Sequence, residues 1–355
     1  MIITGMHRSG TSLVAGITRD LGISAAQPDD MQASPQNPGG FFESVKVADF
    51  NDSLLRSIDA SWDSPPRLNP DDLSRHWQSL PVSKVVEWRE ALALPPEESW
   101  AWSVKDPRLS FLLGAWDRLL ERSLPVIVCV RNPGEVAHSL HLRDGFSHSL
   151  GVALWFSYNR AVFGTLAGRP NLIIDYGRLL NDPEDSVRRI ADFITSSTGS
   201  SVSADPSDVI NRIQPGYRRA TDYLENSLVS EAGELWAILE RLHGDSYSTS
   251  EDLLSIPERA LDLLDLAAQK HRVSVQVDDV TKKRSLLNVE YGVLSGQRDG
   301  LLAERDGLIA ARNELQAGLA STQDYANQLE SQIAEIVNSR GWRGLEKFRG
   351  MIRRP

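Results

Sequence analysis

The chain has 355 residues, with 38 Lys and Arg against 48 Asp and Glu, so its net charge is −10. This length suits one large or two modest domains, and a hydrophobic content of 41% argues against a chain that is disordered throughout. An acidic chain repels phosphate backbones, and we therefore expect no nucleic-acid partner. The single cysteine, Cys129, excludes an internal disulfide and a zinc site built from several cysteines.

The N-terminal part of the chain alternates between short apolar runs and segments with helical spacing. The apolar runs predict strands at residues 2–3, 101–104, 125–130 and 172–174. The helical spacing predicts helices over residues 12–21, 43–58, 109–122, 135–166 and 183–195, with loops over 24–42 and 61–70. Short buried strands that alternate with helices favour an α/β fold with a mostly parallel central sheet.

Residues 286–337 have a seven-residue periodicity. The periodic positions are Leu287, Leu294, Leu301, Leu308, Leu315, Thr322, Leu329 and Ile336. This pattern predicts a left-handed coiled coil that joins copies of the chain, or a long amphipathic helix. Arg298, Arg305 and Arg312 each follow a leucine by four residues and weaken the second apolar seam, so a solvated helix packed on its own domain is the alternative.

The C-terminal segment 338–355 is basic. From Val337 onward the chain carries six basic residues and one acid, Glu346. In a helix, Trp342, Leu345, Phe348 and Ile352 would share one face. A short basic amphipathic helix of this kind predicts peripheral contact with an anionic membrane, and a frayed, solvated terminus is the alternative.

The sequence also predicts where the protein acts and how it is divided. No stretch approaches the roughly 20 apolar residues of a membrane-spanning helix, and the N-terminus has no signal-peptide pattern. We therefore expect a cytoplasmic protein, with the basic tail at the inner face of the membrane. The expected regions are a globular domain over 1–225, a helical extension over 226–285, the heptad segment 286–337 and the tail 338–355.

The segment Gly5-Met-His-Arg-Ser-Gly-Thr-Ser12 has the frame of a phosphate-binding loop between a predicted strand and helix. Glycines allow successive N–H groups to point inward, and the following helix adds its positive N-terminal end. Thr11 stands where an ATPase or kinase has the lysine that reaches the β- and γ-phosphates, and Arg8 is the nearest cation. The loop thus predicts an anion site that lacks a part used in γ-phosphate transfer; a ligand-free glycine turn is the alternative.

Three further segments place charged side chains near the same edge of the predicted sheet. Arg131 follows a strand and Ser139 lies in the next helix, which suits a second phosphate at some distance from the first. Lys105-Asp-Pro-Arg108 follows another strand and adds two cations. Gly40-Phe-Phe-Glu43 places a carboxylate where a loop ends and a helix begins.

Together these segments resemble the P-loop sulfotransferases that use 3'-phosphoadenosine 5'-phosphosulfate (PAPS), above all their bacterial branch. The resemblance covers about residues 1–220 and implies a P-loop-type three-layer fold, to which the heptad segment is added. The segments that carry it are Gly5–Leu13, Gly39–Glu43, Lys105–Arg108, Arg131–Ser139 and Ile173–Leu180.

The resemblance also implies which residues bind PAPS. The 5'-phosphosulfate would be held by Arg8, Ser9, Gly10, Thr11 and Ser12. The 3'-phosphate would be held by Arg131 and Ser139. Arg218 resembles part of a late segment that closes over the cofactor, with Arg219 as the alternative. No metal ion is expected.

Sulfuryl transfer requires a base near the acceptor hydroxyl and cations near the departing oxygen. Glu43 resembles the carboxylate base of glycan and tyrosine sulfotransferases of this fold, and His7 is the alternative base. Arg8 and Lys105 would stabilise the charge of the leaving group. Read without the resemblance, Glu43 is an ordinary first-turn glutamate favoured by the helix dipole.

The sequence therefore predicts a PAPS-dependent sulfotransferase whose acceptor is a hydroxyl of a glycan, a glycolipid or another cell-surface precursor. Residues 24–42 and 61–100 are expected to form acceptor loops, in which Trp62 is the best candidate for stacking on a sugar. The tail resembles those of bacterial polysaccharide-assembly enzymes. The alternatives are a P-loop nucleotide or small-molecule kinase, and a non-catalytic coiled-coil assembly protein with a degenerate nucleotide fold.

Overall fold

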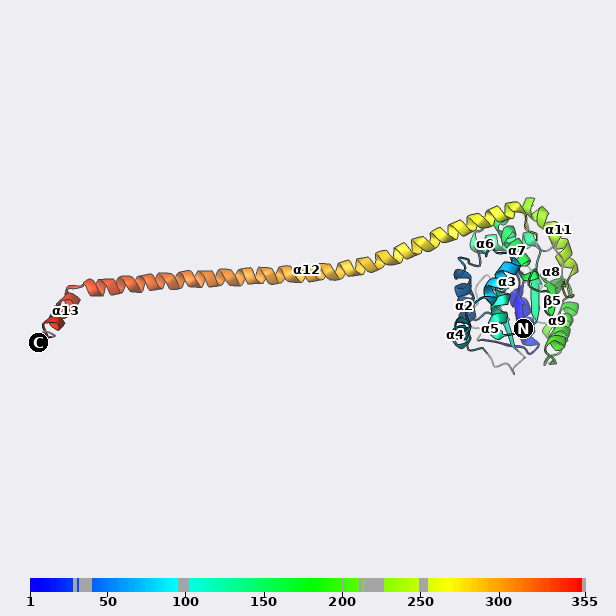
Figure 1. Ribbon diagram of the computed structural model, residues 1–355, viewed down its shortest axis with the longest axis horizontal. Helices are drawn as coiled ribbons and strands as arrows, with labels where there is room; N and C mark the ends of the chain where they lie inside the picture. Colours follow the sequence, from blue (N-terminus) through cyan, green and yellow to red (C-terminus); the bar gives the residue numbers. More distant parts are fainter. Residues whose placement is uncertain are drawn as a thin grey trace. The chain divides into compact units, whose positions relative to one another are not determined.

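The computed structural model of the chain divides into two compact units, Met1–Val275 and Gln276–Pro355 (Figure 1). The structure describes residues 1–27, 31, 40–94, 102–199, 201–210, 213, 227–248 and 255–352. The first unit holds a central sheet covered by helices. The second unit continues a long helix and ends in a short one.

The first unit is built on a five-stranded sheet in the order β2-β3-β1-β4-β5, in which every pair of neighbours is parallel. The strands are β1 (Ile2–Thr4), β2 (Ser24–Ala25), β3 (Trp102–Lys105), β4 (Val126–Val130) and β5 (Asn171–Asp175). Thr4 is in register with Val128, and Cys129 with Ile174. Because β1 lies between β3 and β4, the loops that follow these three strands are neighbours at one edge of the sheet.

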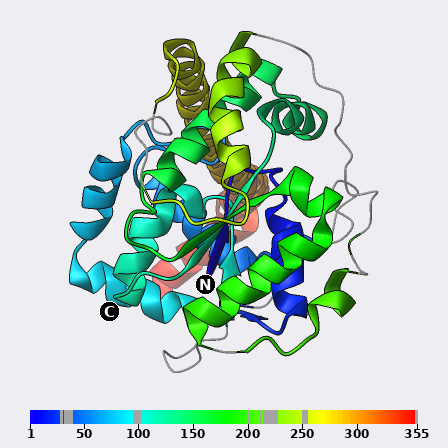
Figure 2. The same ribbon diagram turned by 90° about the vertical axis from the view of Figure 1, so that its right-hand side faces the viewer.

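Helices cover both faces of this sheet (Figure 2). Successive side chains of a strand point to opposite faces, so Ile2 and Val128 join one apolar core whereas Ile3 and Ile127 join another. Helices on the second core are α1 (Thr11–Asp20), α8 (Tyr176–Asn181), α9 (Pro183–Thr198) and α10 (Pro206–Ile210). Those on the first are α2 (Val45–Arg56), α3 (Pro70–Gln78), α4 (Val82–Leu92), α5 (Leu109–Leu120), α6 (Pro133–Asp144), α7 (His148–Phe163) and α11 (Ser227–Arg241). The predicted three-layer α/β fold with a parallel sheet is confirmed.

The single helix expected over residues 135–166 is wrong, because α6 and α7 are separate. Gly145 ends α6 in the left-handed region, with φ 71°. Ser147 then caps α7 by accepting a hydrogen bond from the backbone N–H of Leu150 at 3.2 Å. The break is only a few residues long, and the apolar spacing continues across it, which hid it in the sequence pattern.

The loop expected over residues 61–100 is also wrong in its described part, since it contains α3 and α4. Asn69 caps α3 by accepting from the N–H of Asp72 at 2.8 Å, and Pro70 occupies the first turn. The indole of Trp77 is buried and donates to the carbonyl of Phe111 at 3.1 Å. Both helices therefore pack on the first core, α3 through Trp77 and α4 through Leu92. The expected loop 24–42 likewise begins with the short edge strand β2.

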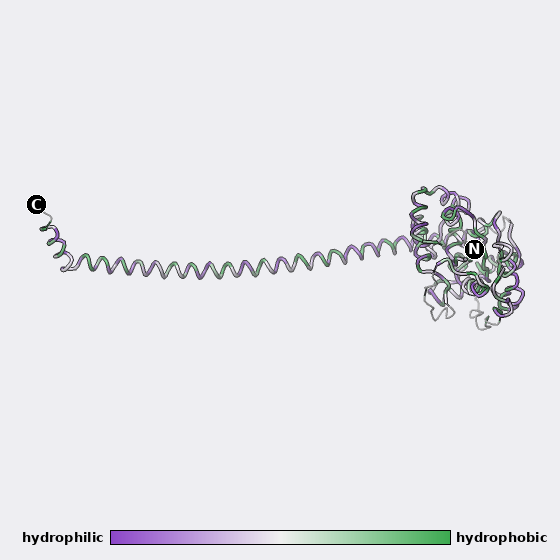
Figure 3. The backbone as a smooth tube through the Cα atoms, turned by 90° about the horizontal axis from the view of Figure 1, so that it is seen from below, coloured by the Kyte–Doolittle hydropathy of each residue, from purple (hydrophilic) through white to green (hydrophobic). Residues whose placement is uncertain are grey.

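The C-terminal part forms α12 (Glu258–Asn338), a continuous helix of 81 residues, and α13 (Arg340–Ile352). Two residues of the predicted helical extension, Leu228 of α11 and Leu264 of α12, are buried in the first apolar core. Further along α12, hydrophobic positions recur among hydrophilic ones (Figure 3). The leucines of the heptad segment expose 40–75% of their surface. Among the described residues, we find no helix that is both long and apolar enough to cross a membrane.

Candidate active site

The loop after β1 is shaped by backbone that only glycine adopts without strain. Gly5 has φ 137° and Gly10 has φ 89°. A Cβ atom at Gly5 would lie 2.2 Å from the carbonyl oxygen of Cys129, and one at Gly10 would lie 2.2 Å from the ring of Tyr176. Gly10 offers no side-chain cap to α1. The positive N-terminal end of that helix is therefore available to an anion, as the sequence predicts.

A cavity of about 510 Å³ opens beside this loop, within the range of roughly 300–1,000 Å³ typical of ligand pockets. It brings together most of the predicted site residues. The predicted residues that line it are His7, Arg8, Gly10, Thr11, Ser12, Glu43, Lys105, Arg131 and Ser139. Ser9 is buried, and among the described residues its hydroxyl has no hydrogen-bond partner. Arg218 and its alternative Arg219 lie outside the described residues.

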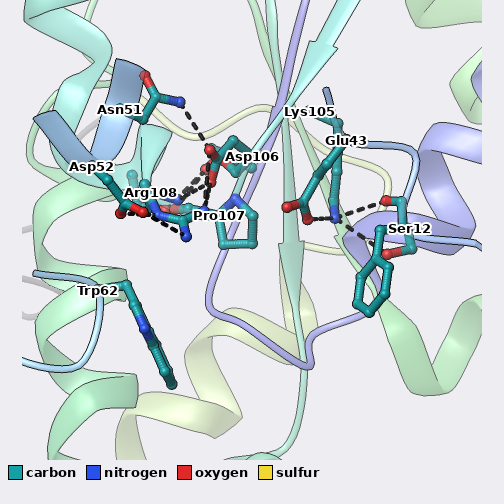
Figure 4. A network of polar contacts seen from close by, with 12 residues as sticks. Ser12, Glu43, Asn51, Asp52, Trp62, Lys105, Asp106, Pro107 and Arg108 are labelled. Carbon is teal, nitrogen blue, oxygen red and sulfur yellow. Dashed lines mark hydrogen bonds and ion pairs between the residues drawn. The ribbon is translucent and has the colours of Figure 1, made fainter. Parts of the chain in front are cut away.

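Lys105 connects the loop to the candidate base (Figure 4). Its ammonium group forms an ion pair with the carboxylate of Glu43 and donates to Ser12 Oγ at 3.2 Å and to the carbonyl oxygen of Phe41 at 3.0 Å. The loop itself contains no lysine, but Lys105 at the end of β3 places its ammonium group beside the loop. Glu43 is only 7% exposed. Burial raises the pKa of its carboxyl, and the neighbouring ammonium group opposes that rise.

Arg8, Arg131 and Ser139 form a second, adjoining cluster. Arg8 Nε donates to Ser139 Oγ at 2.8 Å, and Arg131 Nη1 donates to the carbonyl oxygen of Arg8 at 3.0 Å. The sequence predicts two anion sites at some distance from each other. In the structure Arg8 connects them, because it extends from the loop to the residues assigned to the 3'-phosphate. Burial lowers the pKa of Arg8 to about 10, with Arg143 and Arg131 adding to the effect, so it stays charged at neutral pH.

Two residues that sequence reasoning missed hold Arg131 in place. Glu135 Oε2 accepts from Arg131 Nε at 2.8 Å, and the guanidinium lies 4.6 Å from the centre of the Tyr176 ring. Glu135 lies in the first turn of α6, four residues after Arg131, which itself stands between β4 and that helix. Tyr176 directly follows β5, the strand next to β4, and only the strand order shows that it comes near Arg131.

His7, the alternative base, lies against an aromatic wall. Its ring centroid is 4.7 Å from that of Trp62 and 5.7 Å from that of Tyr158, and in the described part of the chain its buried Nε2 atom has no hydrogen-bond partner. Burial lowers the pKa of this imidazole well below its ordinary value, and nearby cations, first among them Arg108, add to the shift. His7 is thus neutral at physiological pH and a weak proton acceptor, whereas the pKa of Glu43 is shifted the other way.

Trp62 contributes to this wall rather than standing as an isolated platform. It stacks on Phe146 with ring centroids 5.7 Å apart and planes at 22°, and the guanidinium of Arg143 lies 5.2 Å from its ring centre. Together with the contact to His7, these neighbours occupy much of the indole surface. Trp62 nevertheless lines the cavity.

The guanidinium of Arg108 is held by two carboxylates. Its Nε pairs with Asp52 at 2.6 Å and its Nη1 with Asp106 at 3.1 Å (Figure 4). These carboxylates outweigh the effect of burial and raise the pKa of the guanidinium. Asn51 donates to the second oxygen of Asp106 at 2.9 Å. This network fixes the end of β3 and thereby positions Lys105, the neighbour of Asp106 in the chain.

No family model matches this sequence, and no curated protein matches it. The chain is similar in structure to the sulfotransferase domain from the Synechococcus PCC 7002 olefin synthase, with 18% identity and a TM-score of 0.39, over 66% of this chain and 93% of that one. It is similar to the sulfotransferase domain from the curacin biosynthetic pathway with 14% identity and a TM-score of 0.34, over 66% and 97%. Similarities this weak leave the function to be argued from the site itself.

Proposed function

We propose that the protein is a PAPS-dependent sulfotransferase that transfers a sulfuryl group to a hydroxyl. The observation that carries this proposal is the position of Lys105, whose ammonium group touches both Ser12 at the anion loop and the carboxylate of Glu43. An anion site, a cation and a buried base in one cavity are the parts that in-line transfer to a hydroxyl requires.

The residues of the cavity fit a nucleotide with anionic groups at both its 5' and 3' ends. The unpartnered hydroxyl of Ser9 and the uncapped start of α1 suit the 5' group. Arg131 and Ser139 suit a 3'-phosphate, which ADP and ATP lack. When bound, PAPS supplies an activated sulfuryl group. In the described part of the chain, no three His, Cys, Asp or Glu side chains are grouped to hold a metal ion.

The chain's own groups then divide the work. Glu43 accepts the proton of the attacking hydroxyl, and its raised pKa makes it a stronger base than an exposed glutamate. Lys105 holds the carboxylate in its ionised form beforehand. Lying at Ser12, it also offers positive charge where negative charge develops on the leaving group. Arg8 adds a second cation on the other side of the loop.

The proposed acceptor is a carbohydrate hydroxyl on a membrane-carried or cell-surface precursor, with the enzyme working at the inner face of the bacterial membrane. Support comes from α13, where Trp342, Leu345, Phe348 and Ile352 expose 42–71% of their surface beside Arg340, Arg343, Lys347 and Arg349. A helix with this division of residues lies in the plane of an anionic bilayer surface.

The decisive experiment is calorimetric titration with 3',5'-ADP, the desulfated product, and with plain ADP. We expect 3',5'-ADP to bind without magnesium and more tightly than ADP. Arg131→Ala removes charge-assisted hydrogen bonds, each of about 1.5–3 kcal/mol, and is expected to weaken 3',5'-ADP binding roughly 10- to 100-fold. Arg188→Ala, an exposed arginine of α9, is the matched control and is expected to bind like the wild type.

Other outcomes favour other functions. Equal affinities for the two nucleotides contradict the assignment of Arg131 and Ser139. Magnesium-dependent ADP binding with ATP turnover favours the kinase alternative. Absence of binding by either nucleotide favours the non-catalytic assembly protein. If 3',5'-ADP binds as expected, turnover of PAPS with panels of carbohydrate acceptors identifies the substrate.

A further inference from the structure

The apolar stripe of α12 is longer than the heptad segment. One residue in seven is apolar from Leu266 to Ile336, with Thr322 as the exception, and this set is called the stripe below. Its members are Leu266, Val273, Val280, Leu287, Leu294, Leu301, Leu308, Leu315, Leu329 and Ile336. Each exposes 40–75% of its surface.

The stripe also faces away from the side of α12 that packs on the first core. Leu264 is buried there with 3% exposure, and Arg272 pairs with Asp59 of the same unit. At about 100° per residue, Leu266 lies about 200° around the helix from Leu264. The stripe is therefore a second surface, separate from the one that anchors the helix. A seven-residue repeat stays on one face only where helices supercoil around each other.

From this stripe we infer that the protein forms a parallel, in-register homodimer through α12. The second seam, four residues after each stripe position, decides the partner and its direction. Toward the start of the helix this seam mixes basic and apolar residues, Lys270, Val277, Arg284 and Tyr291, and toward its end it is apolar, at Leu319, Ala326 and Ile333. Between these parts, three successive positions are arginines, Arg298, Arg305 and Arg312. The three arginines are called the basic block below.

A parallel, in-register pair separates these two kinds of residue best. Equal positions then face each other, so leucine meets leucine and the basic block meets itself. Arginine can lay its methylene groups along the seam and carry its charge to solvent, where Asp299 and Asp306 pair with Arg298 and Arg305 at 2.6 Å. The apolar layers between remain free of charge.

Other arrangements mix the two kinds. In an antiparallel pair the two seams face one another, so arginines of the basic block would pack against leucines of the partner helix, where burial of charge is costly. A parallel pair shifted by one heptad sets Arg312 opposite Leu319 of the partner subunit. The basic block thus acts like a polar seam residue that fixes register at some cost in stability.

Sedimentation of the full chain and single-cysteine cross-linking test this inference. The natural thiol, Cys129, is buried in β4, and burial raises its pKa to about 12, so it does not compete. We expect a dimer mass that Leu287→Asp combined with Leu315→Asp reduces to that of a monomer. Under mild oxidation, Leu287→Cys is expected to link to itself, because equal positions face each other.

The controls separate the arrangements. Ala317→Cys, two residues beyond a stripe position and on the opposite side of the helix, is expected to stay unlinked. Linking of Leu287→Cys only when it is mixed with a cysteine variant of the second seam, such as Leu319→Cys, indicates an antiparallel pair and overturns the inference. A monomeric or trimeric wild type overturns it as well, and so does cross-linking of Ala317→Cys at the same rate. Nucleotide binding does not enter any of these readouts, so the inference stands or falls apart from the proposed function.

Discussion

At the scale of single residues, the site is organised by pairs that hold buried charges. Lys105 pairs with Glu43, Arg131 with Glu135, and Arg108 with two aspartates. A buried charge without a partner costs several kcal/mol, so removal of either member destabilises the fold as well as the chemistry. Conservative substitutions that keep volume and hydrogen bonding are therefore the informative ones.

Glu43→Gln keeps the shape of the side chain and removes the base. We expect kcat to fall about 10²- to 10⁴-fold, the usual contribution of a general base, whereas 3',5'-ADP is expected to bind at least as tightly as to the wild type. In the wild type, kcat/KM is expected to fall toward acid through a pKa above the ordinary value for glutamate, because Glu43 must be deprotonated and burial raises its pKa.

The pH profile of the variants distinguishes Glu43 from His7. If Glu43 is the base, Glu43→Gln loses the acid limb and His7→Gln keeps it. The reverse result assigns the base to His7. Initial rates of 3',5'-ADP release from PAPS, measured between pH 4.5 and 8, provide the comparison.

Asp175 carries a cost in stability that depends on pH. Its carboxylate caps α8 by accepting from the N–H of Gly177 at 2.7 Å, and burial raises its pKa to about 6. Since the folded pKa exceeds the unfolded one, the penalty is absent below the unfolded pKa and complete above pH 6. Asp175→Asn keeps the cap, and at about 1.4 kcal/mol per pKa unit it is expected to stabilise the fold by about 2–3 kcal/mol at pH 7.

Urea unfolding at pH 7 and at pH 4 measures this difference. Asp182→Asn is the control, because Asp182 also caps a helix, by accepting from the N–H of Asp185 at 3.2 Å, but is exposed. A gain for Asp175→Asn that does not shrink as the pH falls would contradict the role of the buried charge.

At the scale of elements, the loop between β1 and α1 depends on backbone shape. Gly10 and Gly145 both have positive φ, but a Cβ at Gly10 would meet the Tyr176 ring, whereas one at Gly145 meets nothing within 4 Å. Gly145→Ala is expected to cost only the backbone strain of about 1–2 kcal/mol. Gly10→Ala is expected to cost more and to abolish 3',5'-ADP binding. If both variants lose the same free energy of unfolding in urea and the same affinity in calorimetry, the Tyr176 ring moves aside to accommodate the new Cβ atom.

The elements that sequence predicts best are those whose signals are local. The apolar runs of β1, β4 and β5 are dense in branched residues, and Asp182-Pro183 marks the start of α9, where Asp182 caps the helix. The sequence pattern did not predict the break between α6 and α7, because a single glycine, Gly145, ends the first helix. In α3, the short length and polar composition hid a helix whose place depends on one buried tryptophan, Trp77.

In the candidate site, too, the residues with local sequence signals were predictable and the contacts between distant segments were not. The glycine loop, Lys105 and Arg131 were predictable because each follows a strand, and parallel strands end at one edge. The partners of these residues were not predictable where they come from elsewhere in the chain. The contact between Arg131 and Tyr176 depends on β5 lying beside β4, and that between His7 and Trp62 depends on how α2 and its following loop pack.

At the scale of the whole molecule, chemistry and assembly belong to different units. The described residues that line the cavity all lie in Met1–Val275, whereas α13 and most of the stripe lie in Gln276–Pro355. Substitutions in the second unit are therefore expected to change association with other molecules and to leave nucleotide affinity intact.

Sedimentation with lipid vesicles tests the membrane contact of the full chain. We expect binding to vesicles that contain phosphatidylglycerol, weaker binding at high salt, and little binding to vesicles of phosphatidylcholine alone. Leu345→Glu with Phe348→Glu is expected to abolish binding, because both side chains are exposed on the apolar face of α13. Lys282→Glu with Lys283→Glu, on α12, is the control. Equal binding to both kinds of vesicle, or unchanged binding by the α13 variant, contradicts the contact.

The contacts of Lys105 make the base and the anion loop share one cation. An anion that draws the ammonium group toward Ser12 weakens its hold on Glu43, whose carboxyl then takes up a proton more readily. Anion binding at the loop and protonation of Glu43 therefore favour each other. Loss of the proton weakens anion binding, and departure of the anion makes Glu43 hold its proton less tightly. In the proposed reaction, the proton gained from the acceptor would delay departure of the nucleotide, and its loss to solvent would both restore the base and empty the loop. We therefore expect product release to be timed by a deprotonation.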